Sequence, residues 1–215
     1  MNVNNLITRA GAGIIYILVI LIGVLGGHVS FLIIFGAILA IGLFEFYRMV
    51  EKDTSHAISK IFNISMGIVI FLSVFLYIKG ITFYALPAAI LIYLLILIAS
   101  SIFIRRDDIF HGIIYSVFGQ IYITMPLGLL MLISYSYQNN ITGEGSDWVP
   151  ILALFVFTWV NDTAAYFIGS LIGKHKLIEH ISPKKSVEGF IAGILFTLLA
   201  SFIFASFYPG FSTAF

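Results

Sequence analysis

Cysteine is absent from the 215-residue chain, and charged side chains make up only 10% of it. Without cysteine the chain has no disulfide, no thiolate ligand for zinc and no thiol nucleophile. Its formal net charge is +1, which excludes both a strongly basic nucleic-acid-binding surface and an acidic disordered tail. We therefore expect no nucleic-acid partner.

Hydrophobic residues account for 60% of the chain, and the mean hydropathy is +1.09. A soluble domain of this length cannot bury so much apolar surface in one core. A membrane-spanning helix needs about 20 mainly apolar residues, because each residue rises ~1.5 Å across ~30 Å of hydrocarbon. Seven stretches predict an all-α, polytopic integral membrane bundle that forms a single transmembrane domain over residues 1–215. The predicted spans are 11–27, 29–47, 61–79, 81–104, 112–135, 148–172 and 189–208.

The basic residues predict the orientation of this bundle. If the N-terminus is cytoplasmic, ten lysines and arginines fall in the inside segments and Lys79 alone falls outside. Positive charge concentrates on the cytoplasmic side of membrane proteins. We therefore expect a cytoplasmic N-terminus and a cytoplasmic loop at 173–187. The inside residues are Arg9, Arg48, Lys52, Lys60, Arg105, Arg106, Lys174, Lys176, Lys184 and Lys185.

The sixth span contains a carboxylate, Asp162, close to its midpoint. A charge at that depth costs several kcal/mol, so it faces the bundle interior or a wet cavity. Helical spacing places it on one face with three small or polar residues, Thr158, Ala165 and Gly169. Either this face borders a cavity in which Asp162 is functional, or it packs on a close helix neighbour, with Asp162 bonded to a polar group such as Gln120.

The fifth span carries Gln120 and Thr124 on one face, just before Pro126. Proline removes a helical N–H donor and crowds the preceding turn. We therefore expect a kink at Pro126, where the freed carbonyl needs another partner.

Two adjacent lysines, Lys184 and Lys185, stand just before the seventh span. The first turn of a helix has unpaired N–H groups and a partial positive charge, so lysines beside it predict an anion site, with phosphate as the expected anion. Ser186 is expected to cap this helix, and Glu188 lies near its start. The same residues also fit a positive-inside anchor that binds lipid headgroups.

Three sequence blocks, at 159–169, 173–177 and 181–190, follow one another in the last third of the chain. Their residues, order and spacing closely resemble phosphatidate cytidylyltransferases, the CDP-diacylglycerol synthases of bacterial and organellar membranes. The resemblance implies a reaction of CTP with phosphatidic acid that yields CDP-diacylglycerol and pyrophosphate, in phospholipid biosynthesis, with Mg²⁺ or another divalent cation. It also implies a bacterial inner (cytoplasmic) membrane location with the site facing the cytoplasm. Membrane lipids are further partners, and a homodimer is a candidate assembly.

The resemblance implies roles for particular residues. Asp162, Lys184 and Lys185 would be catalytic, the lysines as phosphate clamps and Asp162 also as a metal ligand. The substrate-binding residues would be Asn161, Lys174, Ser182, Ser186 and Glu188.

The family's C-terminal signature, which supplies its principal metal ligands, does not occur in the sequence up to Phe215. We therefore expect this chain to correspond to the N-terminal part of the enzyme, with the main metal ligands outside it. Two other interpretations stay open: a non-catalytic membrane scaffold or transporter, and a related CTP-dependent lipid kinase.

Overall fold

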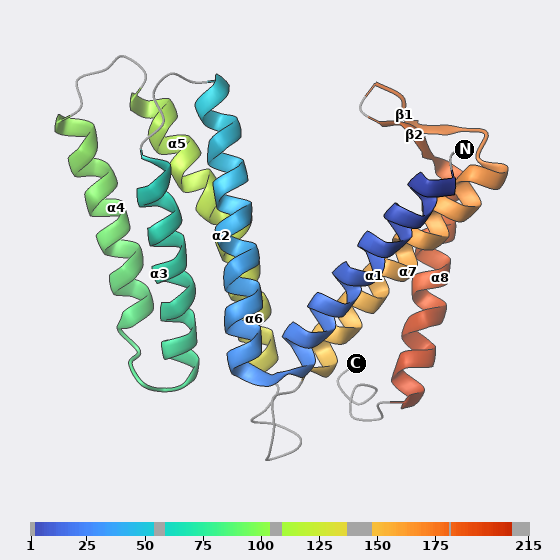
Figure 1. Ribbon diagram of the computed structural model, residues 1–215, viewed down its shortest axis with the longest axis horizontal. Helices are drawn as coiled ribbons and strands as arrows, with labels where there is room; N and C mark the ends of the chain where they lie inside the picture. Colours follow the sequence, from blue (N-terminus) through green and yellow to red (C-terminus); the bar gives the residue numbers. More distant parts are fainter. Residues whose placement is uncertain (1–2, 54–58, 104–108, 137–147, 181, 208–215) are drawn as a thin grey trace. The chain divides into compact units, whose positions relative to one another are not determined.

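The computed structural model describes residues 3–53, 59–103, 109–136, 148–180 and 182–207. The chain divides into two compact units, unit 1 (Met1–Asp147) and unit 2 (Trp148–Phe215) (Figure 1). A single transmembrane domain over the whole chain stays a prediction. Unit 1 contains α1 (Val3–Leu25), α2 (Gly27–Asp53), α3 (Lys60–Ile78), α4 (Ala85–Phe103), α5 (Ile109–Gly119), the π-helical segment η1 (Gln120–Thr124) and α6 (Met125–Ser136). Unit 2 contains α7 (Val149–Ile172), β1 (Lys176–Ile178), β2 (Ser182–Ser186) and α8 (Val187–Phe207).

Each predicted span corresponds to a helix, with α5, η1 and α6 forming the fifth as one continuous helix. Among the described residues, five helical segments are long and apolar enough to cross a membrane. The first and fourth predicted spans contribute shorter apolar segments, Gly11–Leu25 and Ala85–Ser100. The predicted polytopic, helical membrane protein is thereby confirmed, while its orientation stays a prediction.

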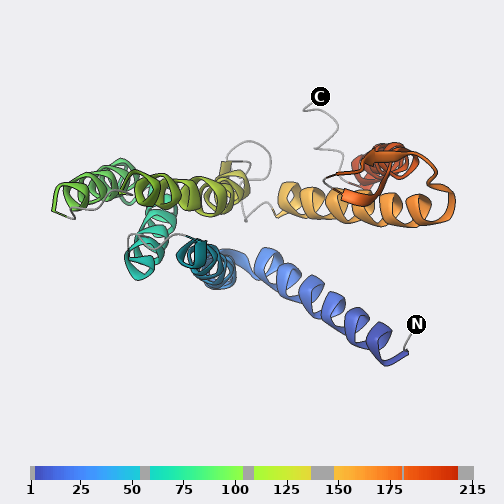
Figure 2. The ribbon, with the colours of Figure 1, turned by 90° about the horizontal axis from the view of Figure 1, so that it is seen from above.

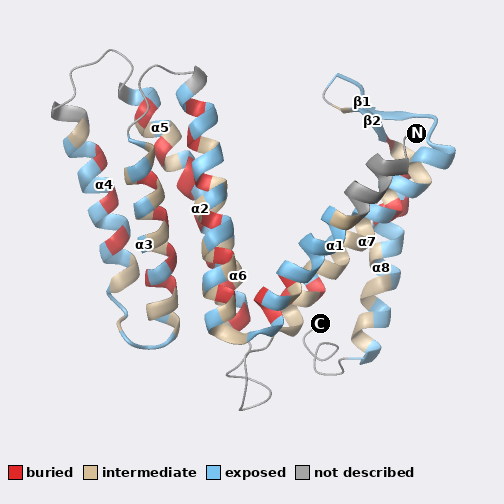
Figure 3. Ribbon diagram, viewed as in Figure 1, coloured by how far each residue is buried: buried red, intermediate tan, exposed pale blue. Residues whose placement is uncertain are grey.

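A network of buried polar groups joins α2, α3, α4 and the α5–η1 helix within unit 1, where buried positions recur along each helix (Figure 3). The side-chain oxygen of Asn63 accepts a hydrogen bond from the Tyr93 hydroxyl at 2.8 Å, and its amide donates to the Ser116 hydroxyl at 3.1 Å. The Gln120 amide donates to the backbone oxygen of Asn63 at 2.8 Å and to the Tyr47 hydroxyl at 3.5 Å. Such bonds hold membrane helices together, because the lipid tails outside are as apolar as the core.

The segment η1 lies immediately before Pro126. Its wider turn is closed by the Met125 N–H, which donates to the Gln120 carbonyl five residues earlier. Such a wider turn is one way in which a helix adapts near a proline that cannot donate to the carbonyl four residues back. The kink expected at Pro126 stays a prediction. The Thr124 hydroxyl donates to the side-chain oxygen of Gln120 at 2.6 Å, and both residues are buried, so their predicted common face is confirmed.

Replacing Asn63 with leucine is expected to destabilise unit 1 by about 2–6 kcal/mol, because two buried hydroxyls lose a partner at about 1–3 kcal/mol each. The control is Ser100→Ala, which removes only a hydroxyl that donates to Leu97 of the same helix. Both tryptophans lie in unit 2, so unfolding in detergent should be followed by far-ultraviolet circular dichroism. Equal unfolding midpoints for the two variants would show that the network does not stabilise the unit.

Candidate functional site

Small residues allow α7 and α8 to pack closely. A Cβ placed on Gly189 would lie 2.6 Å from the Ala165 carbonyl oxygen and 3.0 Å from the Cα of Gly169. A Cβ on Gly193 would lie 3.1 Å from the side-chain oxygen of Asn161. Two glycines four residues apart are typical of membrane helices whose backbones touch. One interpretation of the sixth predicted span, which is α7, was that its small residues pack on a close helix neighbour. That neighbour is α8, and the spacing of its two glycines is the sequence signal that identifies it.

Asp162 lies outside this contact. The α7 residues that meet α8 include Asn161, Ala165 and Gly169, whereas the side chains of Asp162 and Thr158 are exposed. Ala165 and Gly169 of the predicted face therefore lie at the contact, whereas Asp162 and Thr158 do not. Asn161, about 100° around the helix from Asp162, takes the contact position instead.

The carboxylate of Asp162 has no hydrogen bond or ion pair with the described residues of unit 2. The partner considered for it from the sequence, Gln120, uses its side-chain amide in bonds to Asn63, Tyr47 and Thr124 of unit 1. Both oxygens of Asp162 are therefore available to a ligand.

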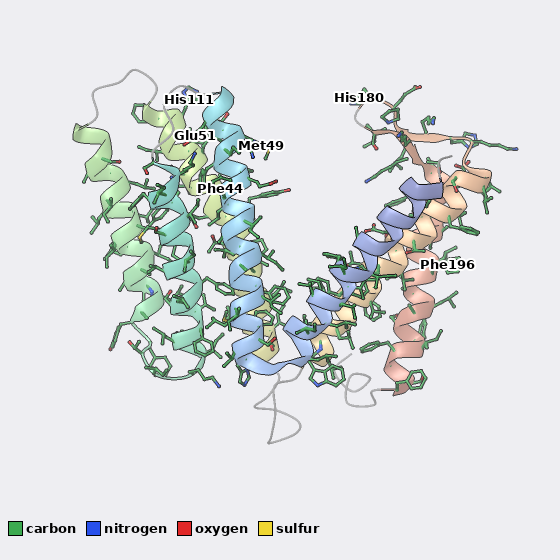
Figure 4. The ribbon with its side chains drawn as sticks, in the orientation of Figure 1. Phe44, Met49, Glu51, His111, His180 and Phe196 are labelled. Atoms are coloured by element: carbon green, nitrogen blue, oxygen red, sulfur yellow. The ribbon has the colours of Figure 1, made fainter. Side chains whose placement is uncertain are left out.

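An open, mainly apolar groove of about 370 Å³ lies on the surface of unit 2. Phe196, labelled in Figure 4, contributes from α8, and the other lining residues come from one side of α7. Grooves of this size and chemistry accept apolar ligands. The α7 residues are Trp159, Val160, Thr163, Ala164, Phe167 and Ile168.

The segment predicted as a loop at 173–187 contains an antiparallel hairpin, formed by β1 and β2 at the end of unit 2 where α7 stops and α8 starts (Figures 1 and 2). Lys176 pairs with Ser186, and Ile178 pairs with Ser182. Two residues along β1 therefore correspond to four along β2, so the register shifts between these two pairs. The Val187 N–H donates to the His175 carbonyl at 2.9 Å and continues this pairing to the first turn of α8.

Three lysines of this segment have open ammonium groups: Lys174, just before β1, and Lys184 and Lys185, within β2. All three side chains are exposed and have no hydrogen-bond or ion-pair partner among the described residues. Lys176 differs, because its ammonium group donates to the Pro183 carbonyl at 2.6 Å. Ser182, at the start of β2, is half-buried.

Ser186 caps α8, as predicted. Its buried hydroxyl accepts a hydrogen bond from the Gly189 N–H at 3.2 Å, the usual geometry of a residue that precedes the first helical turn. The same hydroxyl lies against α7, since a Cβ on Gly169 would be 3.0 Å from it. This position gives Ser186 a structural role, and its contact with substrate stays a prediction.

Glu188, in the first turn of α8, accepts hydrogen bonds from the residues that follow α7. Its carboxylate accepts hydrogen bonds from the backbone N–H groups of Lys174 and His175 at 3.2 Å. One carboxylate oxygen also lies 2.6 Å from Nδ1 of the His175 ring. Glu188 thus fixes the backbone that carries Lys174, and its direct contact with substrate stays a prediction.

His175 was not among the residues assigned a role from the sequence, although it lies in the second of the three blocks. The signal that could have identified it is the pairing of a histidine with a carboxylate, but the two lie 13 residues apart and meet only through the hairpin.

Magnesium is held by several oxygen ligands in near-octahedral geometry. Among the described residues, no group of three or more histidine, aspartate or glutamate side chains is arranged to hold a metal. Asp162 stands alone, and the oxygens of Glu188 are engaged by N–H groups and a histidine ring. The described residues therefore do not by themselves form a magnesium site.

These features define a multi-pass helical membrane protein with an open, lysine-bearing hairpin held between two closely packed membrane helices. The Cytidylyltransferase family model matches residues 7–215, and the chain belongs to that family.

Several curated relatives support this assignment over part of the chain. A phosphatidate cytidylyltransferase of Staphylococcus saprophyticus is 41% identical over 71 residues, which are 33% of this chain and 26% of the relative. The enzyme of the same name from Staphylococcus epidermidis is 41% identical over 75 residues, 35% of this chain and 28% of the relative. The Staphylococcus aureus enzyme is 40% identical over 67 residues, covering 31% and 25%. The chain thus spans about a quarter of the length of the relatives it matches. No solved structure matches it.

Proposed function

We propose that this protein is a phosphatidate cytidylyltransferase that makes CDP-diacylglycerol and pyrophosphate from CTP and phosphatidic acid. The observation that carries the proposal is the set of three open ammonium groups, on Lys174, Lys184 and Lys185, in a chain of the cytidylyltransferase family. Both substrates present phosphates, and lysine is a common ligand of phosphate groups.

The reaction requires positioning and charge stabilisation more than covalent work by the protein. An oxygen of the lipid phosphate attacks the α-phosphorus of CTP, and the bond from that phosphorus to the bridging oxygen of the leaving pyrophosphate breaks. The three lysines would hold phosphate oxygens and stabilise the negative charge that gathers on them. Ser182 and Asn161 would orient the substrates from β2 and α7.

The two substrates arrive from different phases. CTP is soluble, whereas phosphatidic acid lies in the leaflet, so a site at a membrane surface is required. A hairpin between the ends of two membrane helices meets this requirement, and the groove beside Phe196 suits an acyl chain. The excess of basic residues in the predicted inside segments supports a site that faces the cytoplasm. The bacterial relatives support a location in a bacterial inner membrane. A homodimer is also part of the proposal.

Magnesium dependence also belongs to the proposal, on the strength of the family resemblance. Asp162 and Glu179 are the described residues of unit 2 whose carboxylate oxygens are open to a cation, and further ligands would have to come from outside the described residues. Without a metal, Asp162 would orient a substrate group through its carboxylate oxygens.

Transfer of label from CTP into lipid tests the proposal. Membranes that contain the protein are incubated with magnesium, phosphatidic acid and CTP labelled at either the α- or the γ-phosphate. We expect the α-label in the lipid product, and about tenfold less of it at subsaturating CTP when Lys184 and Lys185 are both changed to glutamine. The matched control is Lys79→Gln, a lysine at the end of α3 in unit 1.

The position of the label separates the alternatives. Transfer of the γ-label, particularly to a polyprenol acceptor, would identify a lipid kinase instead. Absence of both labels from lipid would overturn the proposed enzyme and favour the scaffold or transporter interpretation.

A further inference from the structure

His175 is attached to the first turn of α8 by three separate contacts. Its backbone N–H donates to the Glu188 carboxylate at 3.2 Å, and its carbonyl accepts from the Val187 N–H at 2.9 Å. Its ring nitrogen Nδ1 lies 2.6 Å from a Glu188 oxygen. Both the backbone and the ring of this residue are therefore held in place.

The other ring nitrogen of His175 is open. The side chain is 79% exposed, so Nε2 is accessible while Nδ1 is held. Because a carboxylate only accepts hydrogen bonds, Nδ1 must carry a proton, and a proton on Nε2 then makes the ring a cationic donor. No described residue holds Nε2, so this nitrogen is open to a ligand.

The charged groups around His175 favour an anionic ligand. Lys174 and Lys176 flank it in the sequence, and Lys184 and Lys185 lie on the paired strand, while Glu188 is the carboxylate that contacts it. The segment thus carries four lysines against two carboxylates, Glu188 and the exposed Glu179 after β1, and one of the lysines is already bonded to Pro183. Phosphate is the anion that both proposed substrates carry.

We propose that His175 is a phosphate-binding residue, whose Nε2–H donates to a phosphate oxygen while Glu188 holds Nδ1. The inference rests on the proposed function, because the phosphate belongs either to CTP or to phosphatidic acid. It adds a directional donor to a site otherwise made of flexible lysines, and it gives Glu188 the role of positioning the imidazole.

Two substitutions separate phosphate binding from a structural role. In His175→Asn the amide nitrogen replaces Nδ1 and keeps the contact with Glu188, but nothing replaces Nε2. In His175→Gln the amide nitrogen reaches the position of Nε2. We expect CTP to bind about tenfold more weakly to the asparagine variant, with partial recovery in the glutamine variant, as for loss of one hydrogen bond to a charged group. Binding is measured on the full protein in phosphatidylcholine nanodiscs.

Chemical protection shows which substrate occupies Nε2. Diethylpyrocarbonate acylates accessible histidines, and peptide mass spectrometry reports the rate at each residue. His180, on the same hairpin and exposed, is the internal control (Figure 4). One arm adds CTP to phosphatidylcholine nanodiscs, and the other replaces part of the phosphatidylcholine with phosphatidic acid. Slower modification of His175 but not of His180, by about fivefold or more in either arm, identifies the source of the phosphate.

The outcomes distinguish this inference from the proposed function. If wild-type protein transfers the α-label but His175→Asn binds CTP normally and neither substrate protects His175, the inference fails and the proposed function stands. If the asparagine variant binds normally and only the glutamine variant is impaired, His175 is a structural link to Glu188. If wild-type protein neither binds CTP nor transfers label, both proposals are overturned.

Discussion

Asp162→Asn is expected to lower cytidylyl transfer by about 100-fold or more, the loss that removal of one electrostatic contact to a reacting group can produce. The substitution preserves the shape of the side chain and removes its charge. Because the carboxylate is exposed and unpaired within the described part of unit 2, whatever it binds is a substrate, an ion or another part of the protein. The measurement is the initial rate of α-label transfer from CTP to phosphatidic acid.

Stability is the second readout for this variant. Removing a charge from the middle of a membrane helix relieves a cost of several kcal/mol, so the asparagine variant should unfold at the same temperature as wild type or higher. Trp148 and Trp159 both lie in unit 2 and report its unfolding by fluorescence. Thr158→Ala, one helical turn earlier on α7, is the control and should leave the rate unchanged.

Two results would refute the role given to Asp162. One is an asparagine variant that retains at least half of the wild-type rate. The other is a rate that falls only in proportion to a loss of folded protein, which would make Asp162 a structural residue.

Local chemistry explains the features that could be predicted from the sequence. Long apolar stretches predicted the helices, because backbone groups in lipid have to bond within the helix itself. The position of Ser186 one residue before an apolar run predicted its capping bond, which spans only three residues. The shared polar face of Gln120 and Thr124 likewise depends on neighbours within one or two helical turns. The same is true of the altered helical geometry just before Pro126.

The features that the sequence did not predict depend on contacts between distant residues. Which face of α7 meets α8 is decided by Gly189 and Gly193, more than 20 residues away from Ala165, and one step along a helix turns a side chain by about 100°.

The hairpin is a second case of this kind. Its β2 strand contains Pro183 and two lysines, which have low intrinsic preference for strands. Because α7 packs closely on α8, the 14 residues between the two helices have to reverse the direction of the chain. Glu188 and Val187 form hydrogen bonds to the backbone of this connecting segment. A local pattern cannot show this, so His175 and Glu188 could be brought together only by the fold.

The packing that brings the hairpin together can be disrupted with a single methyl group. Gly189→Ala would place a Cβ 2.6 Å from the Ala165 carbonyl oxygen and 3.0 Å from the Gly169 Cα, and backbone atoms cannot rotate away as a side chain can. The two helices would have to separate locally. We expect unit 2 to lose about 2 kcal/mol of stability, within the usual range for overpacking a tight contact.

Substitutions of two other glycines serve as controls for this prediction. Gly193→Ala should be milder, because its Cβ would be 3.1 Å from the side-chain oxygen and 3.2 Å from the backbone oxygen of Asn161, both longer than the 2.6 Å contact at position 189. Gly13→Ala on α1 meets nothing within 4 Å and should gain up to about 1 kcal/mol from the higher helix propensity of alanine. Alanine would bring the same gain at position 189, so a loss there can only reflect the contact.

Tryptophan fluorescence during thermal unfolding compares Gly189→Ala and Gly193→Ala in unit 2, and far-ultraviolet circular dichroism follows Gly13→Ala in unit 1. If Gly189→Ala unfolds like wild type, the close packing of α7 on α8 is refuted. Activity provides the link to function, because Gly189 is next to Glu188 and its N–H bonds Ser186. A helix displaced at this point moves the residue that holds Lys174 and His175, so the rate of label transfer should fall even at temperatures where the variant remains folded.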